Sequence, residues 1–195
     1  MPSQALKTWR STSSDRLDEL LAAHASVGGT SRGRRYATEQ LNASFLIQIA
    51  AHFQLFCRDL HSEAAQILVA AAPPAYAPML RVAFTNRRGL DRGNASVDVI
   101  AADFARFDFD IWTAARAASG STATRQMRLD QLNTWRNAIA HQDFVFSAQQ
   151  QALLSGTSVT LRWARAWRSS CNGLAQTFDR VVGDYLAAIA RHRPW

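Results

Sequence analysis

The sequence contains few of the residues that crosslink a chain or hold a metal ion. Its 195 residues include two cysteines, Cys57 and Cys171, and both fall in segments with helical periodicity. Two cysteines so far apart in sequence indicate neither a disulfide framework nor a zinc ligand set. The motifs Cys-x-x-Cys, His-Glu-x-x-His and Glu-x-x-His, which supply ligands to zinc and di-iron centres, are absent. We therefore expect two buried thiols, no metal site and no cofactor.

Glycine-rich phosphate loops and long apolar runs are absent as well. The sequence has no Gly-x-Gly-x-x-Gly motif and no phosphate-loop lysine motif, which argues against the common nucleotide-binding folds. The N-terminal residues lack the continuous apolar core of a secretion signal, and no stretch reaches the ~20 apolar residues of a membrane span. We therefore expect a soluble, cytoplasmic protein without a membrane partner.

Lysine is almost absent, and arginine carries nearly all of the positive charge. The 22 basic residues include a single lysine, Lys7, and the formal net charge is +7. A positively charged protein attracts polyanions, and the planar guanidinium group binds phosphate with two parallel hydrogen bonds. The composition therefore favours a polyanionic partner. The alternative is that a GC-rich coding sequence produces the same composition without functional selection.

Apolar residues at helical spacing are abundant. Hydrophobic residues make up 48% of the chain, and a chain of this length buries roughly 70% of its unfolded surface, enough for one core. Apolar side chains recur three and four positions apart in residues 14–21, 36–72, 96–120, 122–142 and 157–191, whereas strand alternation is nearly absent. The pattern predicts an all-α protein, an antiparallel helical bundle of four to five helices.

This bundle is expected to form a single domain. We assign residues 1–35 to an N-terminal helix with a Gly/Arg-rich loop and residues 36–195 to the bundle. The long segment 36–72 stops at Pro73 and Pro74, because proline cannot continue a helix. It is expected to be the spine of the bundle.

One heptapeptide in the predicted helix 122–142 has the composition of a reactive site. It reads Trp-Arg-Asn-Ala-Ile-Ala-His over residues 135–141 and places Arg136, Asn137 and His141 within two helical turns. Asn137 and His141 are four residues apart and are neighbours on one face, together with Asp130 and Asn133. A guanidinium, an amide and an imidazole can act on a phosphodiester without a metal.

Arg136 does not share this face in a regular helix. It projects about 140° away from His141, so a single helix does not place guanidinium and imidazole side by side. The reach of the arginine, an unwound turn near His141, or apposition of two copies across a dimer axis would bring the two together. The bare Arg-x4-His spacing is a weak signal in an arginine-rich chain, so the residues around it matter.

These surrounding residues resemble a known signature. Residues 132–141, Leu-Asn-Thr-Trp-Arg-Asn-Ala-Ile-Ala-His, resemble the motif of the HEPN superfamily, in which a histidine follows an arginine at short spacing and a polar residue commonly follows the arginine directly. Asn137 occupies that polar position. The segments Gln-Leu-Asn-Ala-Ser-Phe at 40–45 and Phe-Cys-Arg-Asp-Leu at 56–60 resemble the long helix of bacterial HEPN proteins. The resemblance covers most of the chain.

The resemblance implies a metal-independent endoribonuclease of the toxin or phage-defence type that acts as a homodimer on RNA. In such an enzyme the ribose 2′-hydroxyl attacks the adjacent phosphate. His141 would transfer protons, Arg136 would stabilise charge on the phosphate oxygens, and Asn137 would orient the imidazole or the phosphate. The alternative is structural, because an arginine and a histidine near a helix end also satisfy its carbonyl groups and its dipole.

Further residues are assigned supporting roles. Arg58, Asp59 and Glu63 are candidates for supporting Arg136, with ion pairs on their own helix as the alternative. Candidate RNA contacts are Arg34, Arg35, Arg87 and Arg88, in two arginine-rich loops whose alternative role is that of solvated connections.

Two other interpretations of the whole chain stay open. HEPN proteins include non-catalytic modules that bind RNA, a nucleotide or a protein partner, and a plain helical bundle would use the motif structurally. An antitoxin or another regulatory protein is a further expected partner. Members paired with nucleotidyltransferase antitoxins often carry a tyrosine two residues after the histidine, where this chain has Asp143, so we do not expect regulation through such a tyrosine.

Overall fold

The described part of the protein is built from helices. The computed structural model describes residues 1–28, 36–191 and 193–195, and within these ranges all regular structure is helical, with no strand. The all-α prediction is confirmed. The expected number of four to five helices is too low, because nine α-helical segments lie in the described ranges.

The helices differ widely in length, and short helical turns connect several of them. The α-helices are α1 (Gln4–Thr8), α2 (Ser14–Gly28), α3 (Tyr36–Ala71), α4 (Ala77–Thr85), α5 (Val97–Phe104), α6 (Ile111–Ala118), α7 (Thr122–His141), α8 (Ala148–Leu153) and α9 (Leu161–Ala190). A π-helical turn, η1 (Trp9–Ser13), joins α1 to α2, and 3-10 turns form η2 (Pro74–Tyr76), η3 (Gly89–Asp91) and η4 (Ala105–Phe107). In the described ranges, none of the helices combines the length and apolarity needed to cross a bilayer.

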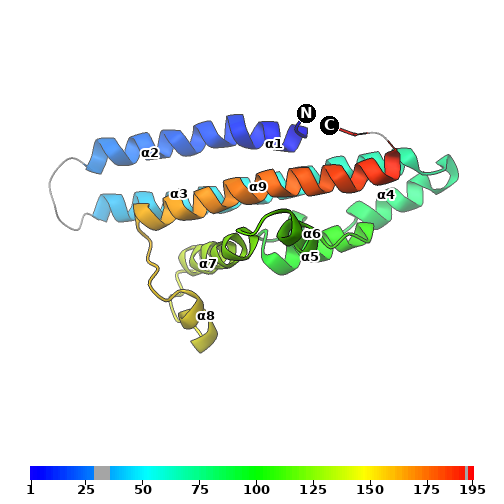
Figure 1. Ribbon diagram of the computed structural model, residues 1–195. Coiled ribbons are helices and arrows are strands. Elements are labelled where there is room, and N and C mark those ends of the chain that lie inside the picture. The colour runs from blue at the N-terminus through cyan, green and yellow to red at the C-terminus, as the bar shows by residue number, and fades with distance from the viewer. Residues whose placement is uncertain (29–35, 192) are drawn as a thin grey trace.

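Helices α3 and α9 form the centre of the molecule. They lie side by side, with α1 and α2 along one side of the pair and α5 to α8 on the other (Figure 1). Phe53 of α3 packs against Phe178 of α9, and both rings are fully buried. Trp167 of α9 is also fully buried, and truncating such a side chain to alanine typically costs about 3–5 kcal/mol. The core therefore sits on the seam between α3 and α9.

One predicted helix is wrong. The segment 96–120 was expected to be continuous, but the chain turns at Asp108, which adopts the left-handed conformation with φ 58°. Asp110 then starts α6 by accepting a hydrogen bond from the amide of Thr113. The apolar periodicity passes through the break because α5, η4 and α6 bury their apolar residues in the same core.

The two thiols lie where the sequence predicts. Cys57 and Cys171 are free and buried, and burial raises the pKa of both thiols. A thiol with a raised pKa stays protonated and is a poor nucleophile. The cysteines therefore serve as small apolar residues of the core.

Candidate functional site

Helix α7 carries the heptapeptide, and its end is fixed by a capping motif. Gln142 adopts the left-handed conformation with φ 53°, and its amide donates to the carbonyl of Ile139. The amide of Asp143 reaches back to the carbonyl of Ala138 over 3.0 Å. This pair of bonds is a Schellman motif, which satisfies the last carbonyl groups and turns the chain away. His141 therefore stands in the last turn of α7, with the chain leaving beside it.

The apolar side of the heptapeptide holds α7 in place. Leu132 is fully buried, and the indole NH of Trp135 donates to the hydroxyl of Thr157 over 3.0 Å. The ring of Phe146, beyond the end of α7, packs edge-on against Trp135 with the ring centroids 5.3 Å apart. The residues around Arg136 and His141 are thus anchored on both sides of the helix end.

The polar face of α7 packs against the loop that precedes α5. The side-chain amide of Asn133 donates to the carbonyl of Ala95 over 3.1 Å, and the side-chain amide of Asn94 donates to Oδ1 of Asn137 over 2.7 Å. Because Asn133 and Asn137 contact the same short loop, they lie on one face of α7, as predicted. His141, one turn further on, continues this face.

Arg136 reaches over to the same face. Its Nη1 donates to Oδ1 of Asn137 over 3.2 Å, although the two residues are adjacent in sequence and start on different sides of the helix. The arginine side chain thus reaches the polar face of α7 at Asn137, one turn before His141. The helix stays regular as far as His141, so unwinding before it plays no part.

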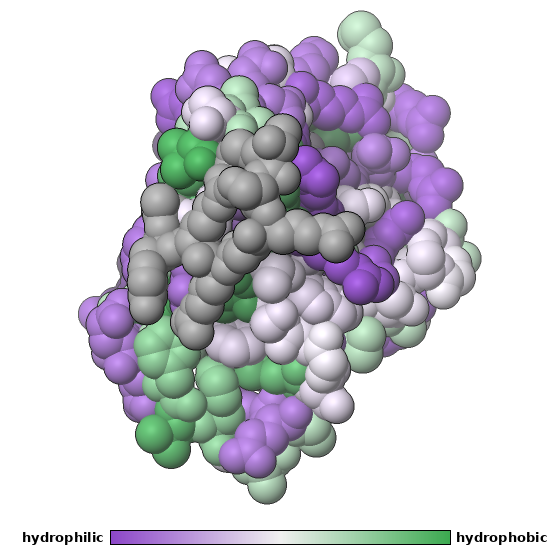
Figure 2. Space-filling view, turned by 90° about the vertical axis from the view of Figure 1, so that its left-hand side faces the viewer, coloured by the Kyte–Doolittle hydropathy of each residue, from purple (hydrophilic) through white to green (hydrophobic). Residues whose placement is uncertain are grey.

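The three side chains lie at the surface and border an apolar patch. Arg136 is half-buried, whereas Asn137 and His141 are exposed. Just beyond the helix end, Phe144 is 52% exposed and Val145 is 87% exposed. Figure 2 looks onto this end of the molecule, and apolar side chains appear among polar ones in its lower part, where α8 lies. An exposed apolar pair beside a cluster of hydrogen-bonding groups is typical of a contact surface.

Asp130 adds a titratable group to this region, two turns before Asn137. Burial, followed by the negative charge of Asp98 on α5, raises the pKa of Asp130 to about 6. The sequence placed Asp130 on the polar face but gave no sign of this shift, because both of its causes, burial and the charge of Asp98, arise only when α7 packs against other parts of the fold.

We predict that Asp130→Asn changes how stability depends on pH. The pKa of Asp130 is raised from 3.8 to about 6 in the folded protein, so this group stabilises the fold at low pH and the contribution is lost as pH rises through 6. Between pH 4 and 7 the free energy of unfolding of the wild type should fall by about 1–2 kcal/mol more than that of Asp130→Asn. This value allows for screening by solvent, because the carboxyl group is only half-buried. Urea unfolding at both pH values measures it.

The control is Asp15→Asn, at an exposed position of α2. It should leave the difference between the two pH values as in the wild type. If the stability of Asp130→Asn depends on pH in the same way as that of the wild type, the raised pKa of Asp130 is contradicted.

The residues proposed to support Arg136 make other contacts. Nε of Arg58 lies 3.6 Å from a carboxylate oxygen of Asp59, which matches the alternative of an ion pair on their own helix. Glu63 accepts hydrogen bonds from the amides of Gln4 and Ala5 at 3.0 and 2.6 Å and so caps the start of α1. Burial raises the pKa of Glu63. Its visible role is to hold the N-terminal helix against α3.

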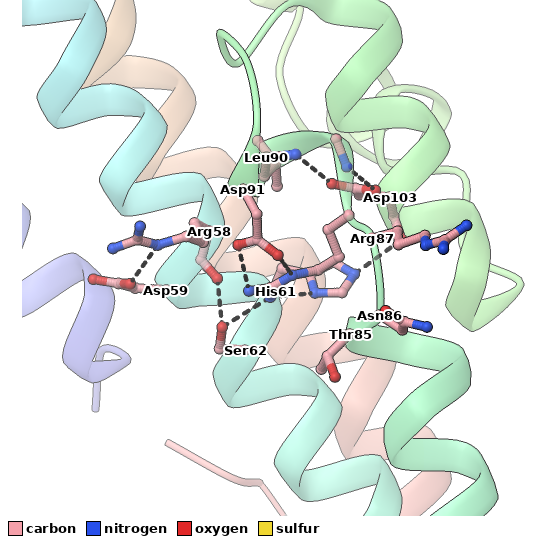
Figure 3. A network of polar contacts seen from close by, with 12 residues as sticks. Arg58, Asp59, His61, Ser62, Thr85, Asn86, Arg87, Leu90, Asp91 and Asp103 are labelled. Atoms are coloured by element: carbon pink, nitrogen blue, oxygen red, sulfur yellow. Dashed lines mark hydrogen bonds and ion pairs between the residues drawn. The ribbon is translucent and has the colours of Figure 1, made fainter.

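Arg88 is not free to contact RNA, because its side chain is buried. Figure 3 shows the polar network around His61, Ser62 and Asp91, the residues to which Arg88 bonds. Its guanidinium donates to both carboxylate oxygens of Asp91, at 3.1 and 2.9 Å, and these bonds lower the pKa of Asp91. It also donates to Nδ1 of His61 over 3.1 Å and to the hydroxyl of Ser62 over 2.9 Å. The prediction of Arg88 as an RNA contact is therefore wrong, and so is the alternative of a solvated side chain.

His61 is the hub of this network and was missed from the sequence. With its Nδ1 accepting from Arg88, its Nε2 donates to the carbonyl of Asp103 over 2.9 Å. Burial is the main cause that lowers the pKa of His61 to about 4, so the ring is neutral near pH 7. The Asp103 carboxylate accepts from the amides of Gly89 and Leu90. The loop between α4 and α5 is thus tied to α3 and serves the fold.

Of the other three predicted RNA contacts, only Arg87 can be placed. Its side chain is exposed, in agreement with a surface role, and its carbonyl accepts from Arg106 over 3.1 Å. Arg34 and Arg35 lie outside the described residues.

We predict unequal stability effects at two neighbouring arginines. Arg88→Ala leaves the buried His61 without its hydrogen-bond donor and the exposed Asp91 without its ion pair, and should lower the free energy of unfolding by about 1–3 kcal/mol. Arg87→Ala removes an exposed side chain and should change it by less than about 0.5 kcal/mol. Chemical denaturation of both variants gives the comparison, and equal effects would argue against the network as the anchor of this loop.

No set of three or more His, Cys, Asp or Glu side chains within the described ranges is arranged to hold a metal ion. Comparison of the chain with protein-family models, with curated proteins and with solved structures gave no match.

Proposed function

We propose that this protein is a metal-independent endoribonuclease of the HEPN type that cleaves RNA as a homodimer. The observation that carries the proposal is the position of Arg136, whose guanidinium bonds to Oδ1 of Asn137 on the polar face that His141 continues. The three residue types that the motif needs are thus presented at one exposed helix end. The net charge of +7 favours an RNA substrate.

The reaction is a transesterification within the RNA. The 2′-oxygen forms a bond to the adjacent phosphorus while the bond from phosphorus to the 5′-oxygen breaks, leaving a 2′,3′-cyclic phosphate and a 5′-hydroxyl. His141 accepts the proton of the 2′-hydroxyl, and the leaving 5′-oxygen takes up a proton from a second imidazole. Arg136 stabilises the negative charge that develops on the phosphate oxygens. Asn137 holds Arg136 in position through its side-chain oxygen.

The need for two imidazoles favours a dimer. One protomer offers an open helix end with one histidine, whereas two copies related by a two-fold axis would supply a base and an acid around one phosphate. Phe144 and Val145 lie beside His141 and are exposed, so burying them against the partner would stabilise the same contact. This arrangement would also double the positive charge around the substrate.

We predict that the purified protein cleaves a pool of transfer RNA in the presence of EDTA. His141→Ala should lower the cleavage rate about 10²–10⁴-fold through loss of proton transfer. Arg136→Ala should lower it about 10²–10³-fold through loss of charge stabilisation. Gel assays give the rates, and mass spectrometry of the fragments identifies the 2′,3′-cyclic phosphate ends.

His24→Ala and Arg165→Ala serve as matched controls, because they remove the same residue types from α2 and α9. Both should cleave at the wild-type rate, and circular dichroism should show all four variants folded. Cleavage that persists in both His141→Ala and Arg136→Ala would overturn the proposal. Tight RNA binding without cleavage by the wild type would favour the non-catalytic module instead.

We further predict that Val145→Asp separates the dimer. Val145 is 87% exposed, so a charge there costs the isolated protomer little, whereas a buried unpaired carboxylate disfavours the dimer contact. Sedimentation should show a dimer for the wild type and a monomer for the variant, with cleavage lost in parallel.

Val82→Asp is the control, at an exposed apolar position of α4. It should remain dimeric and active. A monomeric wild type at micromolar concentration would rule out the shared site.

A further inference from the structure

A polar groove lies at the opposite end of α7 from His141. It has a volume of about 500 Å³ and runs between the N-terminal segment, the turn from α6 to α7, and the middle of α9. Its lining includes Arg10, Ser119, Arg125, Gly173, Gln176 and Arg180. Because α7 has 20 residues, its ends are about 30 Å apart. The groove is therefore separate from the site proposed for cleavage.

Three guanidinium groups line this groove, and their protein partners are neutral. Arg180 donates to the carbonyl of Ala118 over 2.6 Å. Arg125 donates over 3.4 Å to the hydroxyl of Ser119 and, also over 3.4 Å, to the carbonyl of Gly173. Among the residues that the structure describes, no carboxylate forms an ion pair with Arg10, Arg125 or Arg180. Their positive charge is left for an external anion.

The one carboxylate in the lining is already engaged. Asp179 is buried and accepts hydrogen bonds from the amide of Ser3, over 3.0 Å, and from the hydroxyl of the same residue. These bonds fix the start of α1 to α9. Asp179 is therefore held by neutral donors and forms no ion pair with the arginines, and the groove carries an excess of positive charge.

Gly173 explains how Arg125 is held. A Cβ atom at this position would lie 2.3 Å from Nε of Arg125, so only glycine lets the guanidinium rest on the backbone of α9. Glycine inside a helix costs about 1 kcal/mol relative to alanine. The close approach of the arginine accounts for a glycine at a place where the helix alone would disfavour it.

We propose that this groove binds the phosphate groups of a polyanionic ligand. Guanidinium groups form paired, charge-assisted hydrogen bonds with phosphate, and the hydroxyl of Ser119 and the amide of Gln176 add further donors. The volume falls within the range of about 300–1,000 Å³ typical of ligand sites. The lining has no aromatic ring on which a base could stack, so the groove recognises phosphates and not bases. The inference stands on these residues and does not need the ribonuclease proposal.

The phosphates have two chemical sources, an RNA backbone or a free polyphosphate, and two probes distinguish them. Inorganic tripolyphosphate is titrated calorimetrically, and a fluorescein-labelled 12-nucleotide oligouridylate is titrated by anisotropy, both at low salt. The full-length His141→Ala protein is used so that the RNA probe stays intact. We expect at least one probe to bind. A lack of binding by both would overturn the proposal.

The variants Arg125→Gln and Arg180→Gln should each weaken binding of whichever probe the protein binds by about tenfold, as expected for loss of one charge-assisted contact. Arg162→Gln and Arg165→Gln, exposed arginines elsewhere on α9, should weaken it less than about threefold. If Arg125→Gln and Arg180→Gln weaken binding of the oligonucleotide alone, the groove binds an RNA backbone. If they weaken binding of tripolyphosphate alone, the groove binds a free polyphosphate. Equal binding by the groove and control variants would overturn the proposal.

Gly173→Ala provides a second variant that keeps every charge. It displaces the Arg125 guanidinium while favouring the helix by propensity, so binding should fall with the helical content retained. This result separates a placed arginine from a general effect of net charge. Suppose that Gly173→Ala binds as tightly as the wild type and that both control variants bind more weakly. The groove would then be only part of a nonspecific basic surface, and the proposal would be overturned.

Discussion

The pairing of α3 with α9 is the constraint on which the other parts of the molecule depend. Both helices bury aromatic rings along their seam, and each neighbouring element is attached to it by a specific contact. The indole NH of Trp9 donates to Asn172 of α9 over 2.9 Å, and that of Trp167 donates to Gln131 of α7 over 3.4 Å. Because α7 is fastened to this rigid pair, both of its ends are placed by the core. A functional group on a packed helix is held more accurately than one on a loop.

The long helices were predictable because their apolar spacing reflects burial along their whole length. The sequence predicted α3, α7 and α9 to within a few residues at each end, since each presents a continuous stripe to the core. It missed α4, in which no residue is fully buried and Phe84 packs only partly buried against the core. It also joined α5 to α6, because the break at Asp108 depends on a left-handed residue that is not glycine. Periodicity reports burial, and it does not report where the chain turns.

The candidate site was predictable only as far as one helix could carry the argument. The shared face of Asn133 and Asn137 followed from their spacing, but the reach of Arg136 did not. That reach depends on the oxygen of Asn137, which is oriented in turn by Asn94 from a loop distant in sequence. The wrong prediction of Arg88 as an RNA contact has the same origin, because its partner His61 lies on α3, 27 residues earlier in the sequence. Contacts between distant segments decide which arginines are free.

This distinction gives the arginine-rich composition its physical meaning. An arginine held by a carboxylate, such as Arg88 with Asp91, has its charge balanced inside the protein and contributes to the fold. An arginine that bonds to an amide oxygen or a carbonyl, such as Arg136 or Arg180, is positioned without being neutralised. Neutral acceptors thus fix the direction of a guanidinium while leaving its charge available. Both ends of α7 carry arginines of this second kind. The hydrogen-bond partner of each arginine therefore indicates better than the net charge of the chain where an anion would bind.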